Sequence, residues 1–139
     1  MLGIIDFLKS VAGICNTKEL SSDLWRLERK NIILQPGKIM ELKKPGGAVY
    51  LKGKGLSKPI LVVHTDGDEY VGFTNKCTHI GGRRLDPVPG QSALRCCSIS
   101  HSTFDLKGNI ISGPSKKKLT THKVEKTDEG LIIYLDKKI

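Results

Sequence analysis

The chain of 139 residues is long enough for one domain with its own hydrophobic core, so folding does not require disulfide staples. It carries 23 Lys and Arg against 14 Asp and Glu, a formal net charge of +9, and this balance favours anionic partners such as an acidic protein. A nucleic-acid partner is not expected. The three Phe, three Tyr and one Trp are few, and none alternates with the basic runs to form a stacking platform.

Residues 1–15 contain apolar positions but neither a signal peptide nor a membrane span is predicted there. The stretch lacks a basic leader, and an aspartate and a lysine interrupt it. We therefore expect a cytoplasmic protein or one peripheral to a membrane, in a reducing compartment. Disulfides are not expected, because Cys96 and Cys97 are adjacent and Cys15 is remote. Cys15 is interpreted as an unpaired thiol.

Helical periodicity is confined to the N-terminal part of the chain. Apolar residues at helical spacing predict an amphipathic helix over residues 2–14, which would pack on the protein itself or dock on a partner or membrane. A second short helix is predicted over residues 17–28, with Leu20, Leu24 and Leu27 as its apolar stripe and Trp25 as a packing anchor. Residues 1–30 are interpreted as a helical extension.

From Asn31 onward the pattern changes to short β-rich runs separated by Gly, Pro and Asp turns. The predicted strands cover residues 32–34, 39–42, 48–51, 60–64, 70–73, 94–96, 104–106 and 110–111, and a closing hairpin spans 120–135. The stretch 83–93 is read as a spacer with turns. His64 is interpreted as a core or solvated histidine. Residues 31–139 are therefore predicted to form one all-β domain.

Two clusters of cysteine and histidine lie in the middle of this domain. Cys77 and His79 are one residue apart, and Cys96, Cys97 and His101 follow about twenty residues later. Thiolate and imidazole are donors that hold iron and zinc, so the pattern predicts a metal site. The glycine pair at 81–82 permits a tight turn whose backbone N–H groups can approach bound anions.

This stretch resembles the Rieske iron–sulfur domain, whose usual pattern is C-x-H, a gap of roughly fifteen to seventeen residues, and then C-x-x-H. Cys77, His79 and the glycine pair match the C-x-H part of the pattern, the first box, and seventeen residues separate His79 from Cys97, which opens the second box. Further matches are Ser102, Phe104, Asp105, Gly108, Gly113 and Pro114. The resemblance covers residues 60–135 and implies an antiparallel β-sandwich or barrel with a small cluster-binding subdomain, whose loops span about residues 75–114.

The second box departs from the pattern. With Phe104 and Asp105 in register, Ser100 occupies the expected histidine position and His101 the usual glycine. Either the loop bulges by one residue and brings His101 to the iron, or Ser100 is the fourth ligand, or that position is open. His101 is favoured, because imidazole binds iron far better than a neutral hydroxyl.

The resemblance implies a 2Fe-2S cluster bound by Cys77 and Cys97 at one iron and by His79 and His101 at the other. It implies electron transfer, as a ferredoxin-like carrier or as a subunit of a larger soluble or membrane-associated redox complex, with an acidic redox partner. The protein itself is then not an enzyme. The active subunit of a Rieske oxygenase is not expected, because the sequence leaves no room for a mononuclear iron domain.

The resemblance also bears on the reduction potential. In cytochrome bc-type Rieske proteins a serine and a tyrosine donate hydrogen bonds to the cluster sulfurs. Here Ser102 matches the serine, but Phe104 replaces the tyrosine. The loop-to-loop disulfide of those proteins is absent, since its positions are Gly82 and Ile99. Fewer donors predict a lower potential than in that class.

Cys96 gives a poorer ligand spacing than Cys97 and is interpreted as a strand residue that points away from it. A structural zinc site and a degenerate Rieske fold that serves as a binding module remain the alternative functions. Zinc accepts four Cys and His ligands, but C-x-H is not its usual knuckle spacing.

Overall fold

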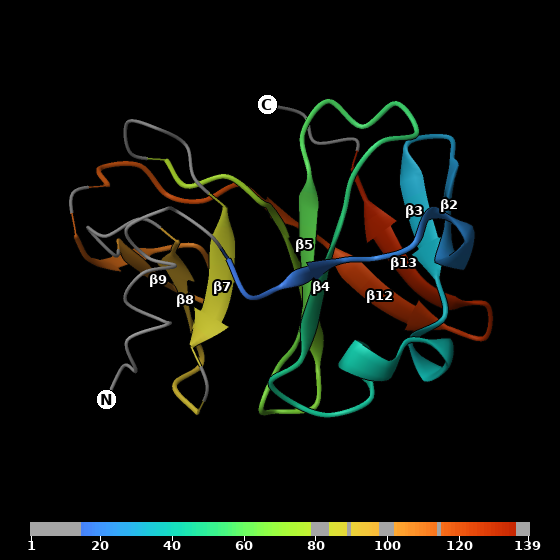
Figure 1. The fold of residues 1–139 in the computed structure, drawn as a ribbon, viewed down its shortest axis with the longest axis horizontal. Helices are drawn as coiled ribbons and strands as arrows, with labels where there is room; N and C mark the ends of the chain where they lie inside the picture. The colour runs from blue at the N-terminus through green and yellow to red at the C-terminus, as the bar shows by residue number, and fades with distance from the viewer. Residues whose placement is uncertain (1–14, 79–83, 89, 98–101, 114, 136–139) are drawn as a thin grey trace.

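A computed structural model describes residues 15–78, 84–88, 90–97, 102–113 and 115–135 of the chain (Figure 1). The helix predicted over residues 2–14 lies outside them. Within these ranges the chain forms β-strands and short 3-10 helices, and no α-helix. The all-β class predicted from the sequence is therefore confirmed. None of the described helices has the length and apolar character needed to cross a membrane.

The strands form three sheets, in the orders β1-β4-β5-β6-β11, β12-β13-β3-β2 and β10-β9-β8-β7. The strands are β1 Lys18–Glu19, β2 Trp25–Glu28, β3 Asn31–Leu34, β4 Ala48–Leu51, β5 Ile60–His64, β6 Tyr70–Thr74, β7 Leu85–Val88, β8 Ala93–Cys96, β9 Thr103–Asp105, β10 Ile110–Ser112, β11 Thr121–His122, β12 Val124–Thr127 and β13 Gly130–Tyr134. The 3-10 helices are η1 Ser22–Leu24, η2 Pro36–Lys38 and η3 Met40–Leu42.

The five-stranded sheet is the central layer, with one sheet on each side (Figure 1). Every residue of β4 and β5 is buried, because both faces of these strands are covered. Val49 and Val62 belong to the core shared with β3 and β13, whereas Tyr50 and Leu61 belong to the core shared with β8 and β9. The period of two along each strand thus supplies two separate hydrophobic cores.

The helix predicted over residues 17–28 is wrong. This stretch contains β1, η1 and β2, and β2 pairs antiparallel with β3 from Trp25 opposite Leu34 to Glu28 opposite Asn31. The three leucines of the expected stripe do not share a face, since Leu20 is buried but Leu24 is 37% exposed. Pairing with β3 buries Trp25, as predicted for a packing anchor, and outweighs the weak local helix preference. The proposed division of the chain at residue 30 stays a prediction.

Three further local predictions differ from the structure. Residues 40–42 form η3 in place of a strand, and the stretch predicted as a spacer contains β7. β7 pairs antiparallel with β8, with Leu85 opposite Cys96 and Pro87 opposite Leu94. Since β7 lies at the edge of its sheet, the missing N–H of Pro87 is tolerated there. The closing hairpin predicted from residue 120 begins only at Val124, because Thr121 and His122 form β11, which pairs with β6 instead. The other predicted strands are present within about two residues of the expected ends.

His64 is a core histidine, 4% exposed at the end of β5. Its Nδ1 lies 2.8 Å from the carbonyl oxygen of Leu42, and its Nε2 lies 2.6 Å from Oδ1 of Asp68. The ring stacks on Tyr70 with 4.4 Å between centroids. Both ring nitrogens and one face are thus occupied by structural contacts.

Candidate metal centre

The candidate site lies where the chain leaves β6 and where it leaves β8. Cys77 follows β6 and is only 2% exposed, because it packs into the core between the central sheet and β8 and β9. Cys97 follows β8 directly and is 7% exposed. His79, Ser100 and His101 lie outside the described residues, so the choice between Ser100 and His101 stays open.

A buried serine lies against Cys77, and a second buried serine holds the first in place. The hydroxyl of Ser115 is 3.2 Å from the Cys77 sulfur, and the backbone N–H of Ser115 donates to the hydroxyl of Ser102 over 3.1 Å. Ser102 is fully buried and Ser115 is 4% exposed. Ser102 was singled out from the sequence, whereas Ser115 was not. The only sequence signal for Ser115 is its place after the Gly113-Pro114 pair.

Gly113 allows this arrangement. Its φ is +96°, and a Cβ at this position would lie 2.4 Å from the Cα and 2.9 Å from the hydroxyl oxygen of Ser102. Any larger residue would push the following segment away from Ser102 and from Cys77. A second tie holds the same segment in place, because the Thr78 hydroxyl donates to the carbonyl oxygen of Lys117 over 2.6 Å. Ser115 and Lys117 therefore lie against Cys77 and Thr78.

The turn between β9 and β10 is closed by Asp105. Its carboxylate accepts hydrogen bonds from the backbone N–H groups of Lys107 and Asn109, at 2.8 and 2.9 Å. Desolvation alone raises the pKa of Asp105, but these hydrogen bonds and the charge of Lys107 together outweigh it, so that the pKa lies below its ordinary value. The carboxylate thus stabilises the hairpin that begins one residue after Ser102.

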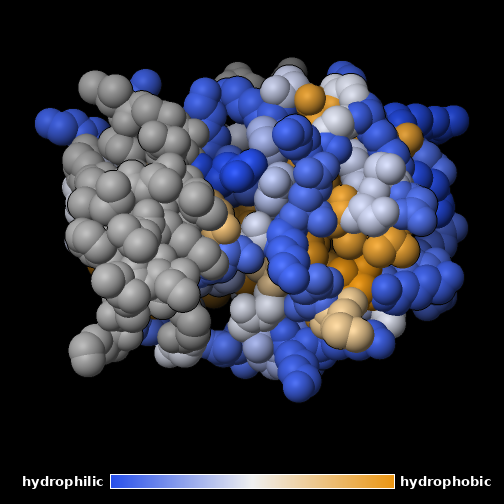
Figure 2. All heavy atoms as spheres, in the orientation of Figure 1, coloured by the Kyte–Doolittle hydropathy of each residue, from blue (hydrophilic) through white to orange (hydrophobic). Residues whose placement is uncertain are grey.

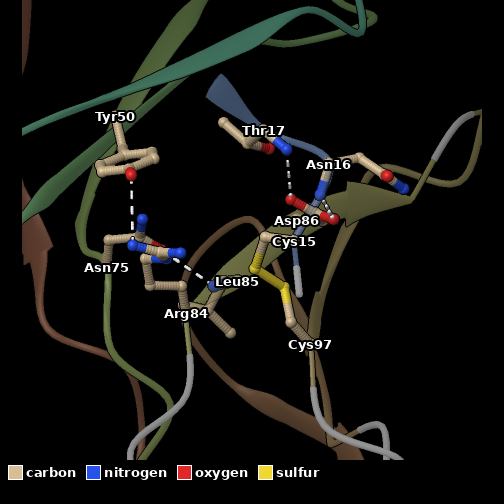
Figure 3. Close-up of a disulfide and its surroundings, with 9 residues drawn as sticks. All are labelled: Cys15, Asn16, Thr17, Tyr50, Asn75, Arg84, Leu85, Asp86 and Cys97. Atoms are coloured by element: carbon tan, nitrogen blue, oxygen red, sulfur yellow. Dashed lines mark hydrogen bonds between the residues drawn. A yellow bond between two sulfur atoms is a disulfide. The ribbon is translucent and has the colours of Figure 1, made fainter. Parts of the chain in front are cut away.

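Cys97 forms a disulfide with Cys15, 82 residues earlier in the chain, with 5.3 Å between the Cα atoms (Figure 3). The expectation of no disulfide, and of an unpaired thiol at Cys15, is therefore wrong. Cys77 and Cys96 are not in disulfides. Cys96 is fully buried in the core beside β9, while its neighbour Cys97 bonds to Cys15.

The segment that carries Cys15 is held in place by backbone contacts of its own (Figure 3). The carboxylate of Asp86 on β7 accepts hydrogen bonds from the N–H groups of Asn16 and Thr17, at 2.7 and 2.9 Å. β1 follows and pairs parallel with β4, so that Lys18 lies opposite Val49. Local periodicity contains no signal for this long-range placement, which explains why the disulfide was missed.

Arg84 lies at the start of β7 and connects this region to the central sheet (Figure 3). Its guanidinium donates to the Tyr50 hydroxyl over 3.1 Å and lies 4.9 Å from the centre of that ring. The Arg84 carbonyl oxygen accepts the N–H of Cys97. Asn75 similarly accepts the N–H of Leu85 through its side chain, over 2.9 Å. β7 therefore holds the two cysteine segments against the same layer.

No family model and no curated relative matches this chain. Solved structures do match, and they define a Rieske-type fold. The plasma membrane Rieske protein PetC3 from Synechocystis PCC 6803 is 21% identical, with a TM-score of 0.53 over 68% of this chain and 92% of that one. The ferredoxin of carbazole 1,9a-dioxygenase from Nocardioides aromaticivorans IC177 is 20% identical, with a TM-score of 0.58 over 73% and 93%.

A chain from the complex of reduced oxygenase and oxidised ferredoxin in carbazole 1,9a-dioxygenase gives a TM-score of 0.60 at 18% identity, over 84% of this chain and 97% of that one. A quaternary ammonium Rieske monooxygenase matches over only 29% of its own length. The predicted Rieske-like fold is therefore confirmed by three matches that cover 68–84% of this chain and 92–97% of the matched chains, and by a match to part of a longer chain.

The described residues fit a 2Fe-2S cluster only in part. Cys77 offers a buried thiol with the Ser115 hydroxyl beside it, which suits a thiolate ligand and a hydrogen-bond donor to it. Cys97 cannot be an iron ligand in this state, because its sulfur is bonded to Cys15 and is not a thiolate. The disulfide-bonded form of the protein is thus incompatible with the predicted ligand set.

Proposed function

We propose that this protein transfers electrons through a Rieske-type 2Fe-2S cluster, as a small carrier or as a non-catalytic subunit of a larger redox complex. The proposed ligands are Cys77, His79, Cys97 and His101, with Cys97 as a free thiolate. When bound, the cluster would take up and release one electron at a time. The observation that carries the proposal is the buried Cys77 thiol beside Ser115, within a Rieske-type fold.

The chain's own residues would hold the ligands and set the potential. The Ser115 hydroxyl lies beside the Cys77 sulfur and can donate one hydrogen bond to it, and the Ser102 hydroxyl holds Ser115 in place by accepting its N–H. Phe104 is fully buried in the core and brings no such donor. We therefore propose a reduction potential below that of Rieske proteins with a tyrosine at this position.

An acidic redox partner is proposed for the end of the molecule that carries the site. Lys76 is exposed beside Cys77, and Lys116, Lys117 and Lys118 are exposed beside Ser115. These lysines fit the net charge of +9 and would steer an acidic protein towards the site. In the orientation of Figure 2, hydrophilic side chains dominate the described surface, apart from a hydrophobic area on the side of β3 and β13. We also propose that the protein is cytoplasmic or peripheral to a membrane.

The test is to measure iron and acid-labile sulfide per chain, with low-temperature EPR of the dithionite-reduced protein, after anaerobic purification with a dithiol. We expect two irons and two sulfides per chain and a Rieske-type signal with a low average g value. His101→Ala should abolish that signal. A signal that survives in His101→Ala would assign the fourth ligand to Ser100 or another residue, and a wild-type protein without iron would refute electron transfer.

One observation favours a second function, a Rieske-type fold without a cluster that acts as a binding module. The Cys15–Cys97 disulfide removes one proposed ligand. Zinc would instead suit the reduced protein, because the sulfurs of Cys15 and Cys97 and a carboxylate oxygen of Asp86 lie within 4.8 Å of one another. Colour separates these functions, because a Rieske cluster is red-brown while the zinc and empty forms are colourless.

A further inference from the structure

Cys97 has two partners that exclude each other. In the structure its sulfur is bonded to Cys15, and in the proposed function the same sulfur binds iron. A sulfur atom cannot do both, because iron ligation requires a thiolate. The choice between them must depend on the oxidation state of this cysteine pair.

Cys15 keeps its place without the disulfide. Asn16 and Thr17 donate to Asp86 on one side of it, and β1 pairs with β4 a few residues further on. The N–H of Leu20 also donates to the carbonyl oxygen of Tyr50 over 2.8 Å. These backbone contacts hold Cys15 beside Cys97 after reduction, so that the thiol stays at a high effective concentration and the bond can form again.

The pair is also placed for exchange with an external thiol. Cys97 is buried, whereas Cys15 is half-buried, and the residues that follow it bind Asp86 on β7, the edge strand of its sheet. A small dithiol can therefore reach the Cys15 sulfur more easily than the Cys97 sulfur. Cys77 and Cys96 are buried in the core and are not in disulfides. Oxidation and reduction are thus confined to one cysteine pair.

We propose that the Cys15–Cys97 disulfide is a redox lock on the cluster site, an inference that rests on the proposed function. A dithiol opens the lock: two electrons and two protons pass to the sulfurs, the S–S bond breaks, and the reductant leaves as its own disulfide. Cys97 then loses its proton and is free to bind iron. An oxidant that accepts two electrons restores the S–S bond: the Cys15 thiol releases its one proton, and the Cys97 thiolate leaves the iron. The protein would carry its cluster under reducing conditions and lose it under oxidising ones.

The test starts from anaerobically purified, cluster-loaded protein and adds diamide, which oxidises two thiols to a disulfide as it is reduced to its hydrazine. In wild type the visible absorption should fall in step with the recovery of the crosslinked Cys15–Cys97 peptide by mass spectrometry. Cys15→Ser has no partner for Cys97, so its cluster should bleach at least ten times more slowly. Cys96→Ser is the matched control, because it removes a cysteine outside the pair, and it should bleach like wild type.

Three results would overturn the lock. Cys15→Ser could bleach as fast as wild type, so that the cluster is lost by another route. The crosslinked peptide could accumulate while the cluster persists, so that Cys97 is not a ligand. Cys15→Ser could be purified without iron while wild type is loaded, so that Cys15 is itself a ligand. Iron in none of the proteins would instead refute the proposed function, and the lock with it.

Discussion

The approach of Gly113 to Ser102 yields a quantitative prediction for the variant Gly113→Ala. A Cβ at Gly113 would lie 2.4 Å from the Cα, 2.9 Å from the hydroxyl oxygen and 3.0 Å from the backbone nitrogen of Ser102. Two of these three atoms belong to the backbone and cannot rotate away. The φ of +96° adds a second cost, because residues with a Cβ rarely adopt that conformation.

The two costs can be separated with a matched control. Left-handed backbone costs about 1–2 kcal/mol for a residue with a Cβ, and overpacking costs about 1–3 kcal/mol. Gly113→Ala incurs both, a sum of roughly 2–5 kcal/mol. Gly53→Ala has nearly the same φ, +92°, but no atom within 4 Å of the added Cβ, so it incurs only the first. At about 3 °C of melting temperature per kcal/mol, the expected losses are roughly 6–15 °C for Gly113→Ala and roughly 3–6 °C for Gly53→Ala.

Thermal unfolding by circular dichroism measures the stability loss, and alkylation of the metal-free protein measures its local effect. Gly113→Ala should speed the alkylation of Cys77, because Ser115 no longer covers its sulfur. Gly53→Ala should leave that rate near wild type, and Cys96 serves as a buried reference in every protein. Equal losses of melting temperature in the two variants, or an unchanged Cys77 rate, would refute the reasoning.

Further predictions concern the same region. Ser102→Ala leaves the buried N–H of Ser115 without its acceptor and should lower the free energy of unfolding, measured by chemical denaturation, by about 1–3 kcal/mol. A variant with the same denaturation midpoint as wild type would show that this hydrogen bond does not contribute to stability. Cys15→Ser removes the disulfide that closes a loop of 82 residues, so its free energy of unfolding should be lower than that of the oxidised wild type by at most about 4–5 kcal/mol. Wild type reduced with a dithiol should lose the same amount. The pKa of Asp105 is lowered in the folded state, so its contribution is full above the ordinary value of 3.8 and is lost as the pH falls below it. Asp105→Asn should therefore be less stable than wild type at neutral pH and approach it towards pH 2–3; a constant difference across this range would contradict the assignment.

The sequence by itself determined much of the β architecture. Continuous apolar runs at residues 48–51 and 60–64 correspond to strands buried on both faces. The motif around Cys77 was enough to predict the Rieske-type fold that the solved structures match. These features were readable because side-chain period, turn residues and motif spacing are local properties of the chain.

Only the tertiary structure decided how distant segments meet. β2 is a strand because β3 lies beside it, although the same residues have helical spacing. Cys15 reaches Cys97 because β4 and Asp86 hold the N-terminal segment across β7. Ser115 reaches Cys77 because Gly113 lets two loops approach closely. Contacts of this kind depend on the path of the whole chain, and no local pattern encodes them.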